Sequence, residues 1–397
     1  MADKTALAES SQALFCAIAD YIGTSATNKL FDVKKYPDYI EFRKALGVGA
    51  YKTALKRVIT PGVAPTLIDK FLNENNDWYQ SSVLIGKKLI NDITLIDPDY
   101  KIKAPGFQKL FYFRGDREVM GNIESLFKIA NKSPVKKQVK FGNVNKWSPA
   151  DIYLASEKDK KIIKKTLSTA KPSSFSFIEL NILTSDLIDT GDLLPLSLKK
   201  TTKDVILQKV NFDKKAEIKM LKKISISPKR VTDWKPYKKV KYGQKTETRD
   251  MRIFLNNNGE IKFRHDPSAK RFVAEFIGSG AEARAGSIGS IKVFCELLSF
   301  IDPTTSRKVL KAYNNAEDDY FKLLKKIEFL RVDKKRFDFE RGAISAITII
   351  NNIMPILKPW FKRTNAKDVE QINDFIRIMY QYITSRTPLS GKFVIAK

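Results

Sequence analysis

Three polar residues in the middle of this chain stand beside apolar runs, where a buried strand would begin or end. Asp151 comes directly before the apolar run of KWSPADIYLAS, Lys199 follows the apolar run of LLPLSLKK, and Asp213 stands in KVNFDKKAE. A carboxylate at the mouth of a buried strand is costly unless it has a partner or a task. The types of side chain indicate a task, because carboxylates hold hard divalent cations and a nearby lysine counters developing negative charge.

The reaction that such a set supports is hydrolysis of a phosphodiester. Mg²⁺ (or Mn²⁺) on oxygen ligands would neutralise the scissile phosphate and lower the pKa of a bound water. We therefore expect Asp151 and Asp213 to hold the cation and Lys199 to position the water. Glu179 and Asp186 are further carboxylates that could replace Asp213, although exposed helix positions are their simpler interpretation.

This set resembles the PD-(D/E)xK restriction-endonuclease-like superfamily in its Ser-x-Lys variant, over residues 147–213. The PAD that ends at Asp151 stands where the family has PD, and the SLK that ends at Lys199 stands where it has (D/E)xK. The resemblance implies that the missing acid has moved about a helix further on, to Asp213. It also implies that Glu9, in an N-terminal helix, lies near the metal. The implied protein is a magnesium-dependent DNA endonuclease, with a phage or virus as one source. The alternative is that Asp151 only caps a strand or helix and that Lys199 is a solvated edge lysine.

The whole chain is strongly basic, with a formal net charge of +28 over 397 residues. Such an excess favours a polyanionic partner: nucleic acid first, with DNA preferred to RNA, then an anionic membrane surface. A lysine-rich genome would give the same composition without a partner.

The excess is greatest in residues 209–249, which hold 14 Lys and Arg against 4 Asp and Glu. Cationic side chains neutralise phosphates and the interleaved aromatic rings can stack on bases, so this segment is predicted to bind nucleic acid. The alternative is a solvated basic loop with aromatics packed on the core. In GSGAEARAGSIGS an arginine could clamp a phosphate, although a strand-to-helix connection explains these glycines more simply. The residues predicted to contact nucleic acid are Lys229, Arg230, Trp234, Lys235, Tyr237, Lys238, Lys239, Lys241 and Arg284.

Other features of the sequence limit the classes of protein to which the chain can belong. Cys16 and Cys295 are far apart and in no metal-ligand spacing, as is typical of a reducing compartment. His265 is the only histidine, which disfavours serine–histidine or cysteine–histidine catalysis. No apolar run is long enough for a membrane span and no secretory signal is visible. We expect an intracellular, cytoplasmic protein, or a virion-associated one if it is viral.

The order of apolar patterns predicts an α+β or α/β fold with a central mixed sheet, a restriction-endonuclease-like core and helical additions at both ends. The expected regions are a helical region at 1–130, the α/β core at 131–300 with the basic segment 209–249, and a helical region at 301–397. Segments 147–155 and 193–199 should be adjacent strands of one sheet. MRIFLNNNGEIKFRHD should form a β-hairpin. The alternative function is a non-catalytic nucleic-acid-binding or packaging protein of a virus or phage.

Overall fold

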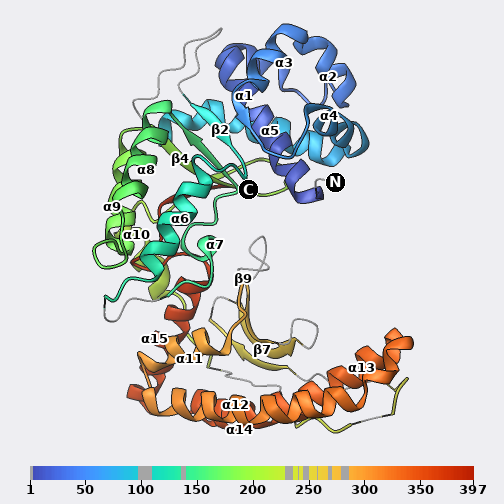
Figure 1. Cartoon of the computed structure of the whole chain (residues 1–397), viewed down its shortest axis with the longest axis vertical. Coiled ribbons are helices and arrows are strands. Elements are labelled where there is room, and N and C mark those ends of the chain that lie inside the picture. Colours follow the sequence, from blue (N-terminus) through green and yellow to red (C-terminus); the bar gives the residue numbers. More distant parts are fainter. Residues whose placement is uncertain are drawn as a thin grey trace. The chain divides into compact units, whose positions relative to one another are not determined.

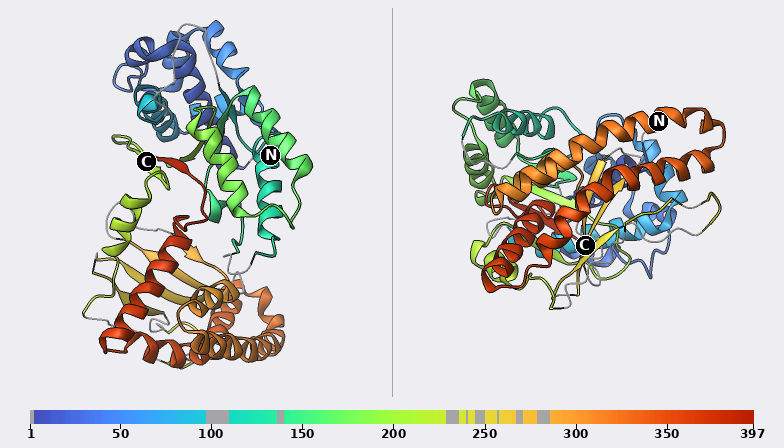
Figure 2. Two further views of the ribbon diagram at one scale, coloured as in Figure 1. Left: turned by 90° about the vertical axis from the view of Figure 1, so that its left-hand side faces the viewer. Right: turned by 90° about the horizontal axis from the view of Figure 1, so that it is seen from below.

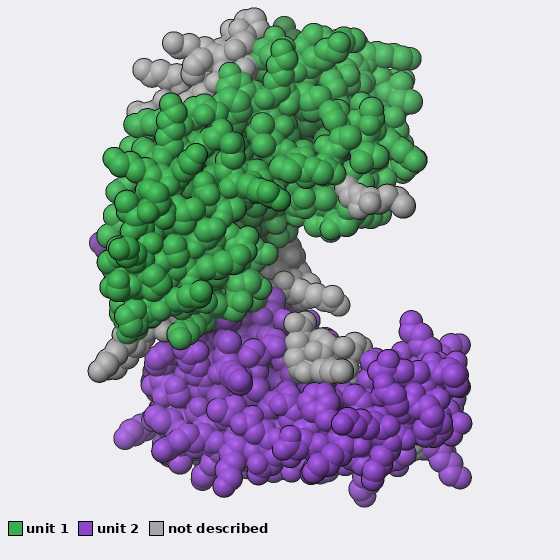
Figure 3. All heavy atoms as spheres, in the orientation of Figure 1, with its two compact units in different colours: residues 1–213, 388–397 green, residues 214–387 purple. Residues whose placement is uncertain are grey.

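The structure is a computed structural model (Figure 1), and it describes residues 3–96, 110–135, 140–228, 236–239, 241–244, 250–256, 258–266, 271–278 and 286–397. The chain divides into two compact units (Figure 3): unit 1 holds residues 1–213 and 388–397, and unit 2 holds residues 214–387. The predicted boundary at 130/131 falls inside helix α6 (Met120–Asn131). The boundary at 300/301 falls inside unit 2, between α11 (Ile291–Ser299) and α12 (Pro303–Lys326). The division into three regions is therefore corrected to two units.

Unit 1 is built on a mixed sheet, as predicted. In the described residues the sheet has six strands in the order β1-β2-β3-β4-β10-β5. The pairs β1–β2 and β4–β10 are parallel, and the others are antiparallel. The strands are β1 (Val58–Ile59), β2 (Phe111–Phe113), β3 (Ile152–Ala155), β4 (Leu193–Leu198), β5 (Leu207–Val210) and β10 (Phe393–Ala396). β1, β2 and β10 lie in regions predicted to be helical, so the prediction of purely helical regions at 1–130 and 301–397 is wrong at these strands.

The predicted pairing of the two motif-bearing strands is confirmed. β3 and β4 are antiparallel neighbours, with Ile152 opposite Leu196 and Ala155 opposite Leu193. The first strand is shorter than expected, because Trp147 ends the short helix α7 (Val144–Trp147) and the strand begins only after Pro149. Asp151 therefore stands at the entrance of β3, as its sequence context indicated.

Helices cover both faces of this sheet. Strand side chains alternate between faces, and Tyr112, Leu154 and Leu196 belong to the apolar core that also contains α1 and α5. Figure 1 shows α6, α8 and α9 on the opposite side of the strands. The helices of unit 1 are α1 (Lys4–Leu30), α2 (Tyr39–Leu46), α3 (Val48–Leu55), α4 (Pro65–Glu74), α5 (Asn76–Ile96), α6, α7, α8 (Glu157–Thr169) and α9 (Phe177–Asp189).

Unit 2 combines a second sheet with long helices. Its described residues form a four-stranded antiparallel sheet, β6 (Met251–Phe254), β7 (Glu260–Asp266), β8 (Arg271–Ile277) and β9 (Gly286–Ile288). The predicted hairpin is confirmed as β6–β7, and Asn258 in its turn has φ 60°. α12 lies beside α14 (Figure 2). The other helices are α10 (Lys214–Lys222), α11, α13 (Lys334–Ser345), α14 (Asn351–Phe361) and α15 (Ala366–Ile383), with a 3₁₀ turn at Glu328–Val332 and a π turn at Ala346–Ile350.

Candidate active site

The Asp151 carboxylate joins the entrance of β3 to the end of β4. Its Oδ2 accepts a hydrogen bond from the Leu198 backbone N–H at 2.6 Å and another from the Ser197 hydroxyl at 3.2 Å. The Asp151 N–H donates to the Leu196 carbonyl at 2.9 Å. Asp151 therefore has a structural role as a cap, and the serine of the SLK motif is a buried donor to it.

The sheet explains why a side-chain acceptor is needed here. The Lys199 N–H donates to the Ala396 carbonyl of β10 at 2.9 Å. N–H groups point to alternate sides along a strand, so the Leu198 N–H points toward β3. The regular pairing of β3 begins only at Ile152, opposite Leu196. The carboxylate of Asp151 thus supplies the acceptor that the strand backbone does not.

The electrostatic setting of Asp151 combines burial with positive charge. Burial raises the pKa of its carboxyl above the ordinary aspartate value. This rise is partly offset by the charge of Lys199, the hydrogen bonds from the Leu198 N–H and the Ser197 hydroxyl, and the charge of Arg114. Lys199 follows β4 and is exposed, and Arg114 follows β2. Two cations from different strands therefore act on one largely buried carboxylate.

A second carboxylate approaches from helix α1. Glu9 Oε2 accepts a hydrogen bond from Arg114 Nε at 2.8 Å, and both side chains are about four-fifths buried. Burial raises the pKa of Glu9, the Arg114 hydrogen bond lowers it, and the nearby charge of Asp151 raises it further. The charge of Asp151 therefore acts on Glu9, and Arg114, which hydrogen-bonds to Glu9, also acts on Asp151. The metal that the resemblance implied near Glu9 remains a prediction.

The donor set fits a hard cation. Within the described residues, Asp151 Oδ1 and Glu9 Oε1 make no hydrogen bond, whereas the second oxygen of each carboxylate is held. Mg²⁺ prefers one or two carboxylates and completes its shell with water and phosphate oxygens. Among the described residues no group of three or more His, Cys, Asp or Glu side chains is placed to hold a metal. A cation here would therefore take its remaining ligands from water and substrate.

Asp213 does not reach this group. β10 runs parallel to β4, with Ala396 beside Leu198, and β5 starts beside Ala396 and runs the opposite way. The four residues of β5 carry the chain about 10 Å toward the other end of the sheet before Asp213. The assignment of Asp213 as a catalytic residue and metal ligand is corrected for this reason.

The other two carboxylates have helix positions. Glu179 closes a capping box at the start of α9, where its Oε2 accepts from the Ser176 N–H at 2.7 Å. The hydrogen bonds from Ser176 lower the pKa of Glu179. Asp186 lies on the exposed side of α9. Both match the simpler interpretation given for them.

Among the residues predicted to bind nucleic acid, Tyr237 is corrected. The residue is 8% exposed and packs with Ala343 and Ala346. Its backbone N–H donates to Asn351 Oδ1 at 2.9 Å, and Asn351 Nδ2 donates back to its carbonyl at 3.1 Å. A ring fixed in this way cannot stack on a base. Lys229, Arg230, Trp234, Lys235 and Arg284 lie outside the described residues.

The three remaining lysines of that prediction are exposed on unit 2. Lys238 and Lys241 are exposed, and so is Lys239, whose Nζ lies 3.0 Å from Glu340 Oε2. Lys239 and Lys241 line an open hollow with Tyr242, Arg336 and Glu340. This surface combines cations with one exposed aromatic ring, which is the composition predicted for the basic segment.

Two residues complete the comparison with the sequence expectations. Arg114 is a functional candidate that the sequence did not reveal; the only signal is an arginine directly after the apolar run FYF. His265 is a buried neutral residue, since burial lowers its pKa to about 4, and it hydrogen-bonds to Ser345. The contact with Ser345 gives His265 a structural role.

Comparison with known proteins gives no relative: no family model, curated protein or solved structure matches this chain. In the part of the chain that the structure describes, none of the helices has both the length and the apolar character needed to cross a membrane.

Proposed function

We propose that this chain is a metal-dependent phosphodiesterase that acts on DNA, with its centre at Asp151, Glu9 and Lys199. The observation that carries the proposal is that Glu9 on α1, held by a hydrogen bond from Arg114, is acted on by the charge of Asp151, while Lys199, directly after β4, acts on Asp151. A non-catalytic binding protein needs only a basic surface and gains nothing from placing two carboxylates together. The restriction-endonuclease-like resemblance, with Asp and Lys on neighbouring strands and Glu on an N-terminal helix, supports the same reading.

Asp151 and Glu9 would hold a Mg²⁺ ion, which supplies charge neutralisation at the phosphate and a more acidic water. The residues of the chain do the positioning. The Leu198 N–H and the Ser197 hydroxyl fix one oxygen of Asp151, and Arg114 fixes one oxygen of Glu9, so the other oxygen of each carboxylate is oriented in advance.

Lys199 has a different task from the carboxylates. Its ammonium group is on the exposed end of β4, close enough to Asp151 to lower the pKa of that carboxyl. From there it can orient the attacking water and counter the negative charge that develops on the phosphate. Because this interaction belongs to the transition state, loss of Lys199 should reduce the rate more than substrate binding.

DNA is the expected substrate because of the net charge of +28. The exposed Lys238, Lys239 and Lys241 would add phosphate contacts on unit 2. We expect sequence-tolerant binding that weakens steeply as salt rises, because each neutralised phosphate releases counterions.

The test is a nicking assay on supercoiled DNA with Mg²⁺ or Mn²⁺ and with EDTA. Wild type should nick only with metal, and Asp151→Asn and Lys199→Ala should each lose at least about 100-fold in rate. Asp204→Asn and Lys203→Ala are matched controls, because these substitutions make the same changes of charge at two exposed residues between β4 and β5. The controls should keep wild-type activity.

A second candidate, a non-catalytic nucleic-acid-binding or packaging protein, is favoured by the hydrogen bonds through which Asp151 already holds β4. Absence of cleavage of any nucleic acid across metals and pH, with DNA binding intact, would support that candidate. Cleavage that persists in Asp151→Asn would place the activity elsewhere.

A further inference from the structure

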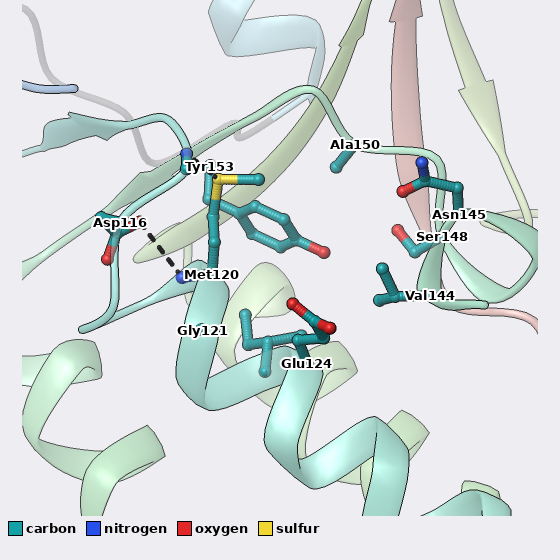
Figure 4. A pocket seen from close by; sticks show the side chains of 11 residues that line it. Asp116, Met120, Gly121, Glu124, Val144, Asn145, Ser148, Ala150 and Tyr153 are labelled. Carbon is teal, nitrogen blue, oxygen red and sulfur yellow. Dashed lines mark hydrogen bonds between the residues drawn. The ribbon is translucent and has the colours of Figure 1, made fainter. Parts of the chain in front are cut away.

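A small cavity of unit 1 has two lining residues that are chain neighbours of the candidate active site (Figure 4). It has a volume of about 140 Å³. A cavity of about 150 Å³ takes one benzene ring, so this one has room for a single six-membered ring. Its lining residues are Gly115, Asp116, Met120, Gly121, Ile123, Glu124, Val144, Asn145, Ser148, Ala150 and Tyr153.

Two hydroxyl groups form the polar part of the inner wall. Ser148 is 2% exposed, and within the described residues its hydroxyl has no hydrogen-bond partner other than the hydroxyl of Tyr153. The Tyr153 hydroxyl is close to it: burial raises the pKa of Tyr153 to about 12, and the Ser148 hydroxyl lowers it in part. The two hydroxyl groups carry two O–H donors and their mutual hydrogen bond uses one, so the other can donate to a ligand with acceptor atoms.

The rest of the cavity suits a flat ring with polar edges. Met120, Ile123 and Val144 give apolar walls. Glu124 and Asn145 stand nearer the solvent, and Figure 4 shows the Glu124 carboxylate, the Ser148 hydroxyl and the Tyr153 hydroxyl pointing toward one space. One oxygen of Glu124 lies 2.7 Å from Lys128 Nζ. The site therefore offers hydroxyl donors on one side and a carboxylate acceptor on another.

The position of the cavity links it to the candidate centre. Gly115 follows Arg114, and Ala150 precedes Asp151, so two lining residues are direct chain neighbours of the centre. This adjacency is the reason for placing the base of a nucleotide in the cavity when its phosphate is bound at Asp151.

We infer that the cavity receives one unstacked pyrimidine base of the DNA substrate, with cytosine preferred. This inference rests on the proposed function, because it assumes that the phosphate of the same strand is bound at the centre. The size selects one ring over the two rings of a purine. Carboxylates accept hydrogen bonds from the cytosine N4 amine, and hydroxyl groups can donate to its O2 and N3 acceptors. A base has to leave its stack to enter, so single-stranded or distorted DNA binds best.

The test measures binding without cleavage. Fluorescein-labelled single strands of eight dC, eight dT, eight dA and eight abasic residues are titrated with Ca²⁺ in place of Mg²⁺ and followed by anisotropy. Wild type should bind dC₈ more tightly than dT₈, and both more tightly than dA₈ and the abasic strand. Ser148→Ala and Glu124→Gln should each weaken dC₈ about 3- to 10-fold and leave the abasic strand unchanged.

Controls separate the base site from folding and from the phosphate contacts. Ser148→Ala removes one hydrogen bond to Tyr153, so it should cost no more than about 1 kcal/mol in the free energy of unfolding, and the variant should be folded at the temperature of the titration. Glu118→Gln is the matched control for Glu124→Gln, since Glu118 is exposed just before α6 and does not line the cavity. Asn145→Trp, at the exposed rim, should block the cavity and remove the preference for dC₈ over the abasic strand.

The outcomes are distinct from those of the nicking assay. Equal affinity of wild type for dC₈, dA₈ and the abasic strand, or no effect of Ser148→Ala, Glu124→Gln and Asn145→Trp on that ratio, would overturn the base site even if the protein nicks DNA. A clear dC₈ preference lost in these variants would support the base site, and absence of nicking would then refute only the catalytic proposal.

Discussion

Replacement of Asp151 should separate its structural role from its proposed role as a metal ligand. In Asp151→Ala the buried Leu198 N–H loses an acceptor at 2.6 Å and the Ser197 hydroxyl loses one at 3.2 Å. Leaving a buried donor without a partner costs about 1–3 kcal/mol, so we expect a loss of that size in the free energy of unfolding.

Asp151→Asn keeps an oxygen in the same place and removes only the charge. Since burial is the main cause that raises the pKa of Asp151, the fold favours the neutral carboxyl relative to the unfolded chain. The asparagine variant should therefore be within about 1 kcal/mol of wild type at neutral pH, because it retains the acceptor. Both variants should lose cleavage.

The assay is urea unfolding followed by circular dichroism and by tryptophan fluorescence, with Asp204→Asn and Asp204→Ala as controls at an exposed aspartate. Equal destabilisation by Ala and Asn would refute the reasoning, because the charge and not the acceptor would then hold β4. No destabilisation by Ala would show that the hydrogen bond to Leu198 contributes nothing.

Three further predictions follow from the same structure. Burial raises the pKa of Glu9 and of Asp151, so the folded protein takes up protons at these carboxyls at a higher pH than the unfolded chain does. The free energy of unfolding of wild type should therefore rise relative to that of Asp151→Asn as the pH falls through the folded pKa of Asp151, as measured by unfolding across pH. For the same reason, calorimetry should show Mn²⁺ affinity falling at a higher pH than for ordinary carboxylates. Gly86→Ala on α5 should destabilise unit 1 by about 1–3 kcal/mol, because the new Cβ would lie 2.9 Å from the Phe15 carbonyl oxygen and from the Phe31 ring. Gly49→Ala at an exposed position of α3 is the control and should stabilise slightly, because its Cβ meets nothing within 4 Å. Equal effects of the two substitutions in thermal unfolding would contradict the packing argument. Replacing Lys238, Lys239 and Lys241 together by Ala should flatten the slope of log affinity against log salt by about 2–3, and a salt titration with unchanged slope would show that these lysines face away from DNA.

The sequence predicted the parts of the fold that depend on local patterns. The mixed sheet, the pairing of β3 with β4 and the hairpin of unit 2 all follow from apolar runs bounded by turn residues. The short strands β1, β2 and β10 were missed, because two to four apolar residues carry no periodicity. β10 becomes a strand only because β4 and β5, far earlier in the chain, offer it two free edges.

The candidate site shows the same limit. Asp151 was visible as a carboxylate at a strand entrance, and the resemblance pointed to Lys199 and Glu9. Asp213 was misplaced because spacing along the chain does not give the direction in which β5 runs. Arg114 was missed because its role arises only when β2 brings it beside α1.

Tyr237 illustrates how tertiary contacts decide between two readings of one residue. An aromatic ring in a lysine-rich segment is typical of base stacking, and the sequence alone cannot show that Ala343 and Ala346 cover it. Exposed Tyr242, a few residues later, has the accessibility that Tyr237 lacks.

The measurement that tests the central claim most directly is calorimetric titration of Mn²⁺ into wild type, Lys199→Ala and Asp151→Asn, each also assayed for nicking. We predict that Lys199→Ala binds Mn²⁺ as wild type does but fails to nick DNA, while Asp151→Asn loses both. Equal Mn²⁺ binding by wild type and Asp151→Asn, or no binding by wild type, would contradict a metal centre at Asp151 and Glu9.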